Sequence, residues 1–201
     1  MSKLSNTPSP PNKTSGRKIL LILSVVFLLP FTVAATLHLL DLRPSGKSYG
    51  DIIQPPRALQ IPVLHDAAGK AFKREQWLKK WSVVMVDSTG CAQPCQAQVH
   101  LLKQVHTSLN KDIKRVQRIL LVATEVKSET FIALQKQYPD LLILGGADAE
   151  AVKFAAEFNV AGGSVYLVDP LGNLMMSYPE KMDSKELFSD LKRLLKNSWA
   201  G

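Results

Sequence analysis

The two cysteines of this chain, Cys91 and Cys95, lie four positions apart. They follow an apolar run at 83–86 and a turn of small residues at 88–90. This order predicts a buried strand, a tight turn and a helix that begins near Cys91. The unpaired N–H groups and the dipole at a helix N-terminus stabilise a thiolate, which attacks disulfides and binds soft metals. The pair is therefore the candidate site for redox chemistry or metal binding.

Three functions of the pair remain open: thiol–disulfide exchange, Cu(I) handling by two thiolates, and a structural disulfide. In a regular helix, residues i and i+4 share a face, but their Cβ atoms lie farther apart than the roughly 3.8 Å that a disulfide needs. A bridge becomes feasible if Cys91 still belongs to the turn. We expect Cys91 to be the more exposed thiolate, which attacks a client disulfide or receives copper. Cys95 then resolves the mixed disulfide or supplies the second metal ligand.

Two other kinds of side chain have both a chemical and a structural interpretation. Asp87 directly follows the central strand, where a buried carboxylate can shuttle protons; we favour a solvated residue at the strand end. The adjacent Met175 and Met176 offer thioethers for copper, but one of them must face the core if they lie in a strand. Tyr166 is expected in the core.

None of the histidines is expected to be a third metal ligand. His106 lies 11 residues beyond Cys95, about 16 Å along a helix. His100 faces away from the apolar stripe of the same helix, and His65 ends a predicted edge strand. We expect all three on the surface or in turns.

The charge distribution argues against nucleic-acid binding. The formal net charge is +8, but four cations precede the long apolar run: Lys3, Lys13, Arg17 and Lys18. From Asp41 onward the chain has 21 Lys and Arg against 17 Asp and Glu, a net of +4 without a basic stripe. Two cysteines placed together also argue against a disulfide scaffold.

The N-terminal part of the chain predicts a membrane anchor. Residues 1–18 are polar and expected to form a disordered cytoplasmic tail. Residues 19–40 form an uncharged run of 22 residues, long enough for a transmembrane helix, which we favour over a cleaved signal peptide. The cations before it place the N-terminus in the cytoplasm and the remainder in the periplasm, with a single pass through the inner membrane. A linker at 41–57 and a globular domain at 58–201 are predicted to follow.

The periodicity of the globular part predicts an α/β domain. A buried strand, a helix and a second buried strand precede another helix, a hairpin and a last helix, which is the thioredoxin-like order of a central mixed sheet flanked by helices. The predicted strands are 59–64, 83–86, 119–124, 141–144, 165–168 and 174–178. The predicted helices are 73–80, 96–110, and three that begin at Ser128, Asp148 and Asp183.

These features together resemble the Sco/SenC family of membrane-anchored, thioredoxin-fold proteins that help to assemble the copper centre of cytochrome oxidase. The resemblance depends on the single N-terminal anchor, the strand that leads into Cys91-x-x-x-Cys95, the insert near 128–145, and the hairpin from Tyr166 to Gly172.

The chain departs from the family pattern at two places. The family usually carries prolines around the cysteines and an acidic residue between them, whereas Ala92, Gln93 and Pro94 stand here. The family also places a histidine, its third copper ligand, about five residues before the hairpin tyrosine. The corresponding stretch, 159–164, has no histidine. The resemblance is therefore to a divergent member.

The resemblance implies assistance in cytochrome c oxidase biogenesis through thiol–disulfide exchange, Cu(I) handling by Cys91 and Cys95, or both. The implied partner is the copper-binding subunit of the oxidase or another copper or thiol assembly protein. In the first case the chain would be a thiol–disulfide oxidoreductase. The alternative is a non-catalytic assembly scaffold with a degenerate Sco fold and a structural disulfide.

Overall fold

The computed structural model describes residues 13–39, 48–158 and 165–198. The chain divides into two compact units, Met1–Gly46 and Lys47–Gly201. The helices are α1 (Lys13–Leu39), α2 (Arg74–Trp77), α3 (Gln93–Ser108), α4 (Glu129–Gln137), α5 (Ala149–Ala156) and α6 (Ser184–Asn197), with a 3₁₀ helix at Asn110–Arg115. The strands are β1 (Asp51–Ala58), β2 (Leu64–Asp66), β3 (Ala71–Phe72), β4 (Trp81–Asp87), β5 (Val116–Val122), β6 (Leu141–Gly145), β7 (Val165–Val168) and β8 (Asn173–Tyr178).

Helix α1 contains the predicted membrane span. Its segment Gly16–Leu37 is long and apolar enough to cross a bilayer. The helix continues through Pro30 and begins at Lys13, so part of the tail that we expected to be disordered is helical. The remainder of that tail, 1–12, lies outside the described residues. Helix α1 is thus a candidate membrane anchor.

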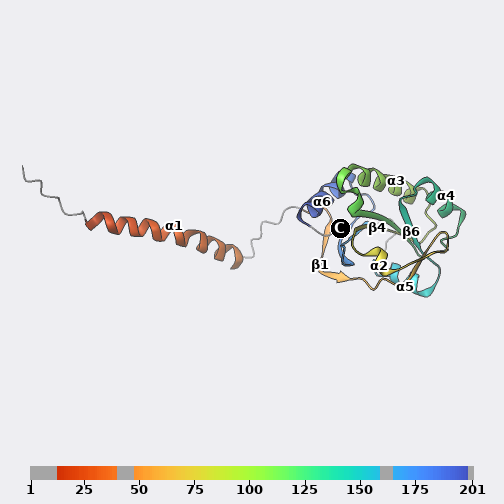
Figure 1. The fold of residues 1–201 in the computed structure, drawn as a ribbon, viewed down its shortest axis with the longest axis horizontal. Coiled ribbons are helices and arrows are strands. Elements are labelled where there is room, and N and C mark those ends of the chain that lie inside the picture. The colour runs from red at the N-terminus through yellow and green to blue at the C-terminus, as the bar shows by residue number, and fades with distance from the viewer. Residues whose placement is uncertain (1–12, 40–47, 159–164, 199–201) are drawn as a thin grey trace, which may run out of the picture. The chain divides into compact units, whose positions relative to one another are not determined.

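The second unit is built on one mixed eight-stranded sheet, in the order β1-β8-β7-β4-β5-β6-β2-β3. Strands β4, β5 and β6 are parallel, and β7 pairs antiparallel with β4. Helices α3, α4 and α6 cover one face, whereas α2 and α5 cover the other (Figure 1). This arrangement confirms the predicted thioredoxin-like fold.

The N-terminal edge of the sheet differs from the prediction. Residues 51–58 form β1, which pairs with β8, although we assigned 51–57 to the linker. The expected strand at 59–64 is absent apart from Leu64, which begins β2. Pro55 and Pro56 have no N–H to donate and are tolerated in β1 because it is the outermost strand. The same prolines made the segment resemble a linker.

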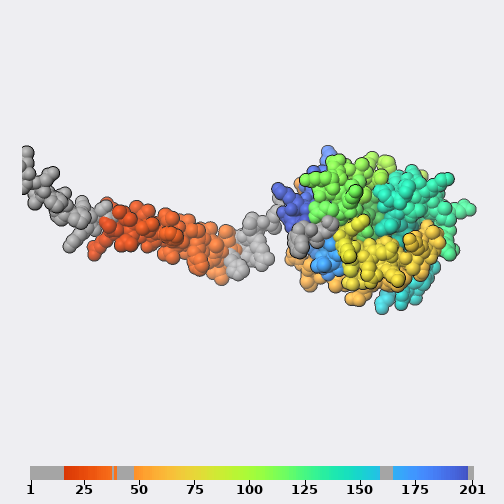
Figure 2. Space-filling view, in the orientation of Figure 1, coloured from red at the N-terminus to blue at the C-terminus, as the bar shows by residue number. Residues whose placement is uncertain are grey.

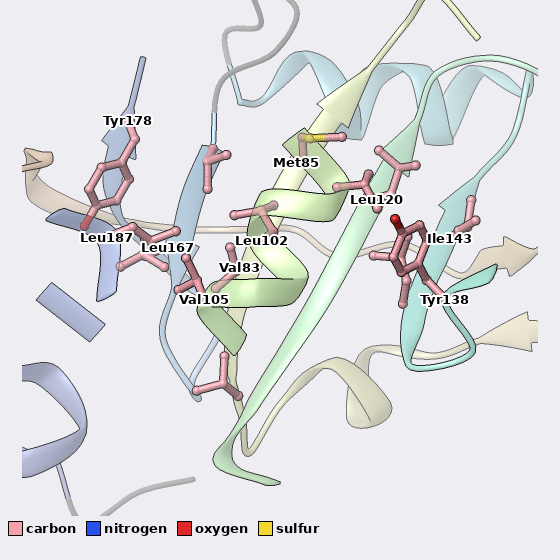
Figure 3. Packing of buried hydrophobic residues seen from close by; sticks show 14 of the residues in the cluster. Val83, Met85, Leu102, Val105, Leu120, Tyr138, Ile143, Leu167, Tyr178 and Leu187 are labelled. Atoms are coloured by element: carbon pink, nitrogen blue, oxygen red, sulfur yellow. The ribbon is translucent and has the colours of Figure 1, made fainter. Parts of the chain in front are cut away.

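Strand β4 lies at the centre of the domain, and its side chains alternate between two apolar clusters. Val83 and Met85 face α3 and α6, whereas Val84 and Val86 face α2 and α5. All seven β4 residues are buried, which explains the continuous apolar run in the sequence. Figure 3 shows the first cluster, with Met85 at the end of β4 beside α3. In Figure 2, α3 (green) and the segment around α2 (yellow) form much of the visible surface of this unit.

A buried carboxylate on α6 holds the beginning of the domain. Asp190 is 1% exposed and accepts hydrogen bonds from the backbone N–H groups of Tyr49 (2.9 Å) and Gly50 (3.1 Å). It also accepts the Tyr178 hydroxyl at 2.9 Å and pairs with Arg193 at 3.0 Å. Burial raises the pKa of Tyr178, and the Asp190 charge raises it further, so the hydroxyl stays protonated. We call this set the Asp190 cluster.

Candidate functional site

Cys91 and Cys95 form a disulfide at the end of the central strand, with their Cα atoms 5.0 Å apart. Helix α3 begins only at Gln93, so Cys91 lies in the preceding loop and Cys95 in the first turn. The predicted helix start was therefore two residues early. This displacement allows the bridge, because two helical residues four positions apart are too widely spaced for one.

The exposure of the two sulfurs is the reverse of our prediction. Cys91 is 0% exposed and packs in the apolar cluster beneath α3, whereas Cys95 is half-buried. Cys91 adopts a left-handed conformation, with φ of +53°, after Gly90 at +89°. This turn directs the Cys91 side chain into the core. The expectation that Cys91 is the more exposed thiolate was wrong.

Cys95 lines a hollow of about 190 Å³ at the surface. Its lining also includes Pro94 and Gln98 of α3, Glu180 and the buried Met85. The Gln98 amide donates to the carbonyl oxygen of Glu180 at 3.4 Å, which links α3 to the loop between β8 and α6. Of the two cysteines, Cys95 is therefore the one that is partly exposed and lines this hollow, whereas Cys91 is buried.

Sequence reasoning missed Met85, which is 2% exposed and lines the same hollow as Cys95. The signal was its alternation with Val83 on the α3 face of β4. We considered only Met175 and Met176 as thioether donors. Met176 is buried and Met175 half-buried, as a strand requires, and the Met176 sulfur lies 3.9 Å from the Tyr178 hydroxyl. Tyr166 is buried as predicted.

Asp87 is not the solvated residue that we favoured. Its side chain is buried, and its carboxylate accepts hydrogen bonds from the loop that leads to Cys91. The residue therefore has a structural task at the site.

Two of the three histidines of the domain are exposed, as expected. His65 pairs with Gly145, which pairs with Val122, which in turn pairs with Asp87. His65 is thus three strand spacings from β4, about 14 Å. His100 is exposed and contacts the Tyr138 hydroxyl at 3.2 Å.

His106 contradicts the prediction of a surface position, because it is 8% exposed. Its Nε2 lies 2.9 Å from the Val116 carbonyl oxygen and 3.1 Å from that of Ile113, so Nε2 carries the hydrogen. Its Nδ1 lies 3.6 Å from Asp140 Oδ2. Asp140 also pairs with Lys103 at 3.1 Å and with the buried Arg118 at 2.9 Å. We call these four side chains the Asp140 cluster.

Because of His106, the wild-type protein is expected to lose stability in mild acid. His106→Gln should abolish this loss. Burial lowers the pKa of His106 from 6.5, and the Arg118 charge lowers it further, against the raising effect of the Val116 and Ile113 carbonyls and of the Asp140 charge. The unfolded chain therefore binds this proton first, so the wild type loses stability as pH falls below 6.5. Guanidinium unfolding above and below pH 6.5 measures the effect. An equal pH dependence in the two proteins would contradict it.

The donor set at the pair is composed of sulfur. Among the residues that the structure describes, no group of three His, Cys, Asp or Glu side chains could hold a metal ion. The stretch 159–164, which lacks the family histidine, lies outside that description. After reduction, two cysteine sulfurs and the nearby Met85 thioether suit Cu(I), a soft ion, better than Cu(II).

Comparison with protein families identifies the chain. The family model described as "Transmembrane-like, thioredoxin-like, C-terminal domain" matches residues 81–198, more than half of the chain. The chain belongs to this family. The match begins at the first residue of β4, so it includes the disulfide and helices α3 to α6. A comparison with curated protein sequences gives no match.

Solved structures of Sco proteins share this fold. Yeast Sco1 with copper bound is 20% identical, covers 70% of this chain and 90% of its own, and gives a TM-score of 0.57. A SCO1/SenC family lipoprotein from Bacillus anthracis is 19% identical, with coverages of 71% and 99% and a TM-score of 0.60. BsSco, a Sco-family cytochrome c oxidase assembly protein with a disulfide switch, is 17% identical. It covers 74% of this chain and 99% of its own, with a TM-score of 0.58. At these identities the likeness establishes the fold.

Proposed function

We propose that this chain is a membrane-anchored thioredoxin-like protein that assists cytochrome c oxidase biogenesis through its Cys91–Cys95 pair. The observation that carries the proposal is the disulfide that follows β4, whose Cys95 sulfur belongs to a half-buried residue that lines a surface hollow. A thiolate of a client can reach this sulfur, so the pair can exchange electrons with it. The fold shared with copper-bound Sco1 and with BsSco supports the choice of pathway.

The first test is a redox titration of the full-length chain in detergent. The oxidised protein is equilibrated with glutathione buffers of increasing reducing strength, and the free thiols are counted by alkylation and mass spectrometry. We expect one two-electron transition that involves Cys91 and Cys95 together. The matched controls are Cys91→Ser and Cys95→Ser, in which this transition cannot occur.

A disulfide that resists glutathione but yields to dithiothreitol would contradict thiol–disulfide exchange. The rival function, a non-catalytic assembly scaffold, would then be favoured. The burial of Cys91 in the apolar cluster is the observation that supports this rival.

Cu(I) handling is the second candidate, and the position of Met85 favours it. Reduction of the pair would leave two thiolates beside a thioether, with copper as the cargo that they receive and transfer. Anaerobic Cu(I) titration of the reduced full-length chain should show one tight equivalent that Cys91→Ser loses. Met85→Leu should weaken binding, whereas Met182→Leu, whose side chain lies outside the hollow, should leave it unchanged. Absence of specific binding would exclude the copper-carrier function.

The proposed partner is the copper-binding subunit of the oxidase or another copper or thiol assembly protein. We further propose that α1 anchors the chain in the inner membrane, with the N-terminus in the cytoplasm and the domain in the periplasm, because the cations precede the span. Alkaline phosphatase fused to the C-terminus should be active. An inactive phosphatase, together with fluorescence of a green fluorescent protein fusion, would contradict this orientation.

A further inference from the structure

The carboxylate of Asp87 organises the loop that carries Cys91. Its Oδ2 atom accepts hydrogen bonds from the backbone N–H groups of Thr89 at 3.1 Å, Gly90 at 2.8 Å and Cys91 at 2.8 Å. Its Oδ1 atom accepts the Thr89 hydroxyl at 2.9 Å. Asp87 is 6% exposed. One buried side chain therefore fixes every backbone N–H group of residues 89–91.

These hydrogen bonds hold a backbone conformation that a cysteine seldom adopts. Gly90 and Cys91 both have positive φ, which is energetically costly for an L-residue such as Cys91. The Asp87 carboxylate compensates for this cost and keeps the Cys91 side chain turned into the core. The loop thereby decides which sulfur solvent can reach, since only Cys95 lines the hollow.

We propose that a client thiolate attacks the Cys95 sulfur, that Cys91 is the buried leaving sulfur, and that Asp87 is the positioning residue that enforces this order. The inference depends on the proposed thiol–disulfide exchange and assigns the roles within it. It reverses the order expected from the sequence, in which Cys91 was the exposed thiolate.

The direction of approach supports this order. In thiol–disulfide exchange the attacking sulfur approaches along the S–S axis, from the side opposite the leaving sulfur. Because Cys95 lines the hollow, a client sulfur that attacks Cys95 can approach through it, with Cys91 as the leaving group. Attack on Cys91 requires an approach through the apolar cluster that encloses it.

The reaction balances with a client dithiol as the reductant. The first client thiolate forms a bond to Cys95 Sγ and breaks the Cys91–Cys95 bond, and Cys91 leaves with the electron pair and takes up a proton. The second client thiolate then attacks the client sulfur of the mixed disulfide and releases Cys95. Two electrons pass from the client to the pair, and the client becomes a disulfide.

Reduced glutathione serves as the probe of the first step. Oxidised full-length protein in detergent is mixed with glutathione and quenched rapidly with acid, before Cys91 can close the bond again, and the adduct is located by mass spectrometry. We expect about tenfold or more adduct on Cys95 than on Cys91. Adduct that is equal on both residues, or mainly on Cys91, would overturn the assignment.

Two substitutions of Asp87 separate geometry from charge. In Asp87→Asn, the side-chain oxygen can still accept the three backbone N–H groups while its NH₂ donates to Thr89, so the Cys95 preference should stay within about twofold of the wild type. In Asp87→Ala, no acceptor remains, so the preference should fall by about threefold or more. Loss of the preference in Asp87→Asn would overturn the positioning role, as would its retention in Asp87→Ala.

Asp66→Ala is the matched control. Asp66 Oδ1 accepts the backbone N–H groups of Ala68 at 3.0 Å and Lys70 at 2.8 Å, in a surface turn beside β2. Its removal should leave the Cys95 preference unchanged, and an equal change in this variant would overturn a specific role for Asp87. Adduct on neither cysteine in any protein would overturn the proposed exchange function and this inference with it. Adduct on Cys91 would overturn the inference alone.

Discussion

Replacement of Asp190 by alanine is expected to lower the free energy of unfolding by about 3–5 kcal/mol. The carboxylate is buried and accepts the N–H groups of Tyr49 and Gly50 and the Tyr178 hydroxyl. Alanine leaves these donors without their acceptor. The bonds from Gly50 and Tyr178 are buried, and each buried group left unsatisfied costs about 1–3 kcal/mol. The neighbouring packing cannot adapt easily, since a Cβ at Gly50 would lie only 2.5 Å from the Tyr178 ring.

Guanidinium unfolding of the full-length chain measures the loss. Asp183→Ala is the matched control on the same helix, because Asp183 caps the N-terminus of α6 by accepting the Lys185 N–H, and loss of a cap costs about 1 kcal/mol. Hydrogen exchange should also accelerate at Tyr49 and Gly50 in Asp190→Ala alone. Equal losses in the two variants would show that the Asp190 cluster is not a special source of stability.

Replacement of Asp140 by alanine is expected to cost about 2–4 kcal/mol, although 38% of the Asp140 side chain is exposed. The cost arises from its partner, because the Arg118 side chain is 1% exposed and would keep its charge without a carboxylate. Solvent that enters through the gap would screen part of this penalty, so the expected value lies below that of a fully buried pair. Arg118→Met in the Asp140→Ala background should recover stability.

Asp112→Ala is the control for an ordinary ion pair. Asp112 and Arg115 are each about a quarter exposed, so we expect a loss of less than about 1 kcal/mol. Acid titration gives a second measure. Burial would raise the pKa of Asp140, but the hydrogen bonds from Arg118 and Lys103 outweigh it and lower the pKa from 3.8 to about 2. The stability that Asp140 contributes is present above pH 3.8 and is lost as pH falls through about 2, so the difference between the two proteins should shrink in that window.

Two features of the fold were predictable from the sequence: the buried central strand and the starts of two helices. Strand β4 is buried on both faces and therefore reads as an unbroken apolar run. The caps Asp148 and Asp183 marked the starts of α5 and α6, and both side chains make their capping hydrogen bonds. Ser128 occupies the same position before α4, but its hydroxyl makes no such bond.

The errors at the site came from contacts that periodicity does not encode. The inward direction of Cys91 follows from the carboxylate four residues earlier; Asp87 followed by Ser, Thr and Gly is a turn signature that offered a clue. The burial of His106 depends on carbonyl groups in the following 3₁₀ helix and at the start of β5. The Asp140 cluster joins α3, β5 and the loop before β6, so tertiary structure alone reveals it.

The disulfide closes a ring that contains only the residues from Cys91 to Cys95. By the chain-entropy relation, a cross-link of this size restricts the unfolded chain by only about 2 kcal/mol, compared with nearly 5 kcal/mol for a ring of about 100 residues. The sheet, both apolar clusters and the Asp190 cluster do not depend on this bond to bring distant segments together. Opening of the disulfide, which the proposed exchange requires, is therefore expected to leave the domain folded.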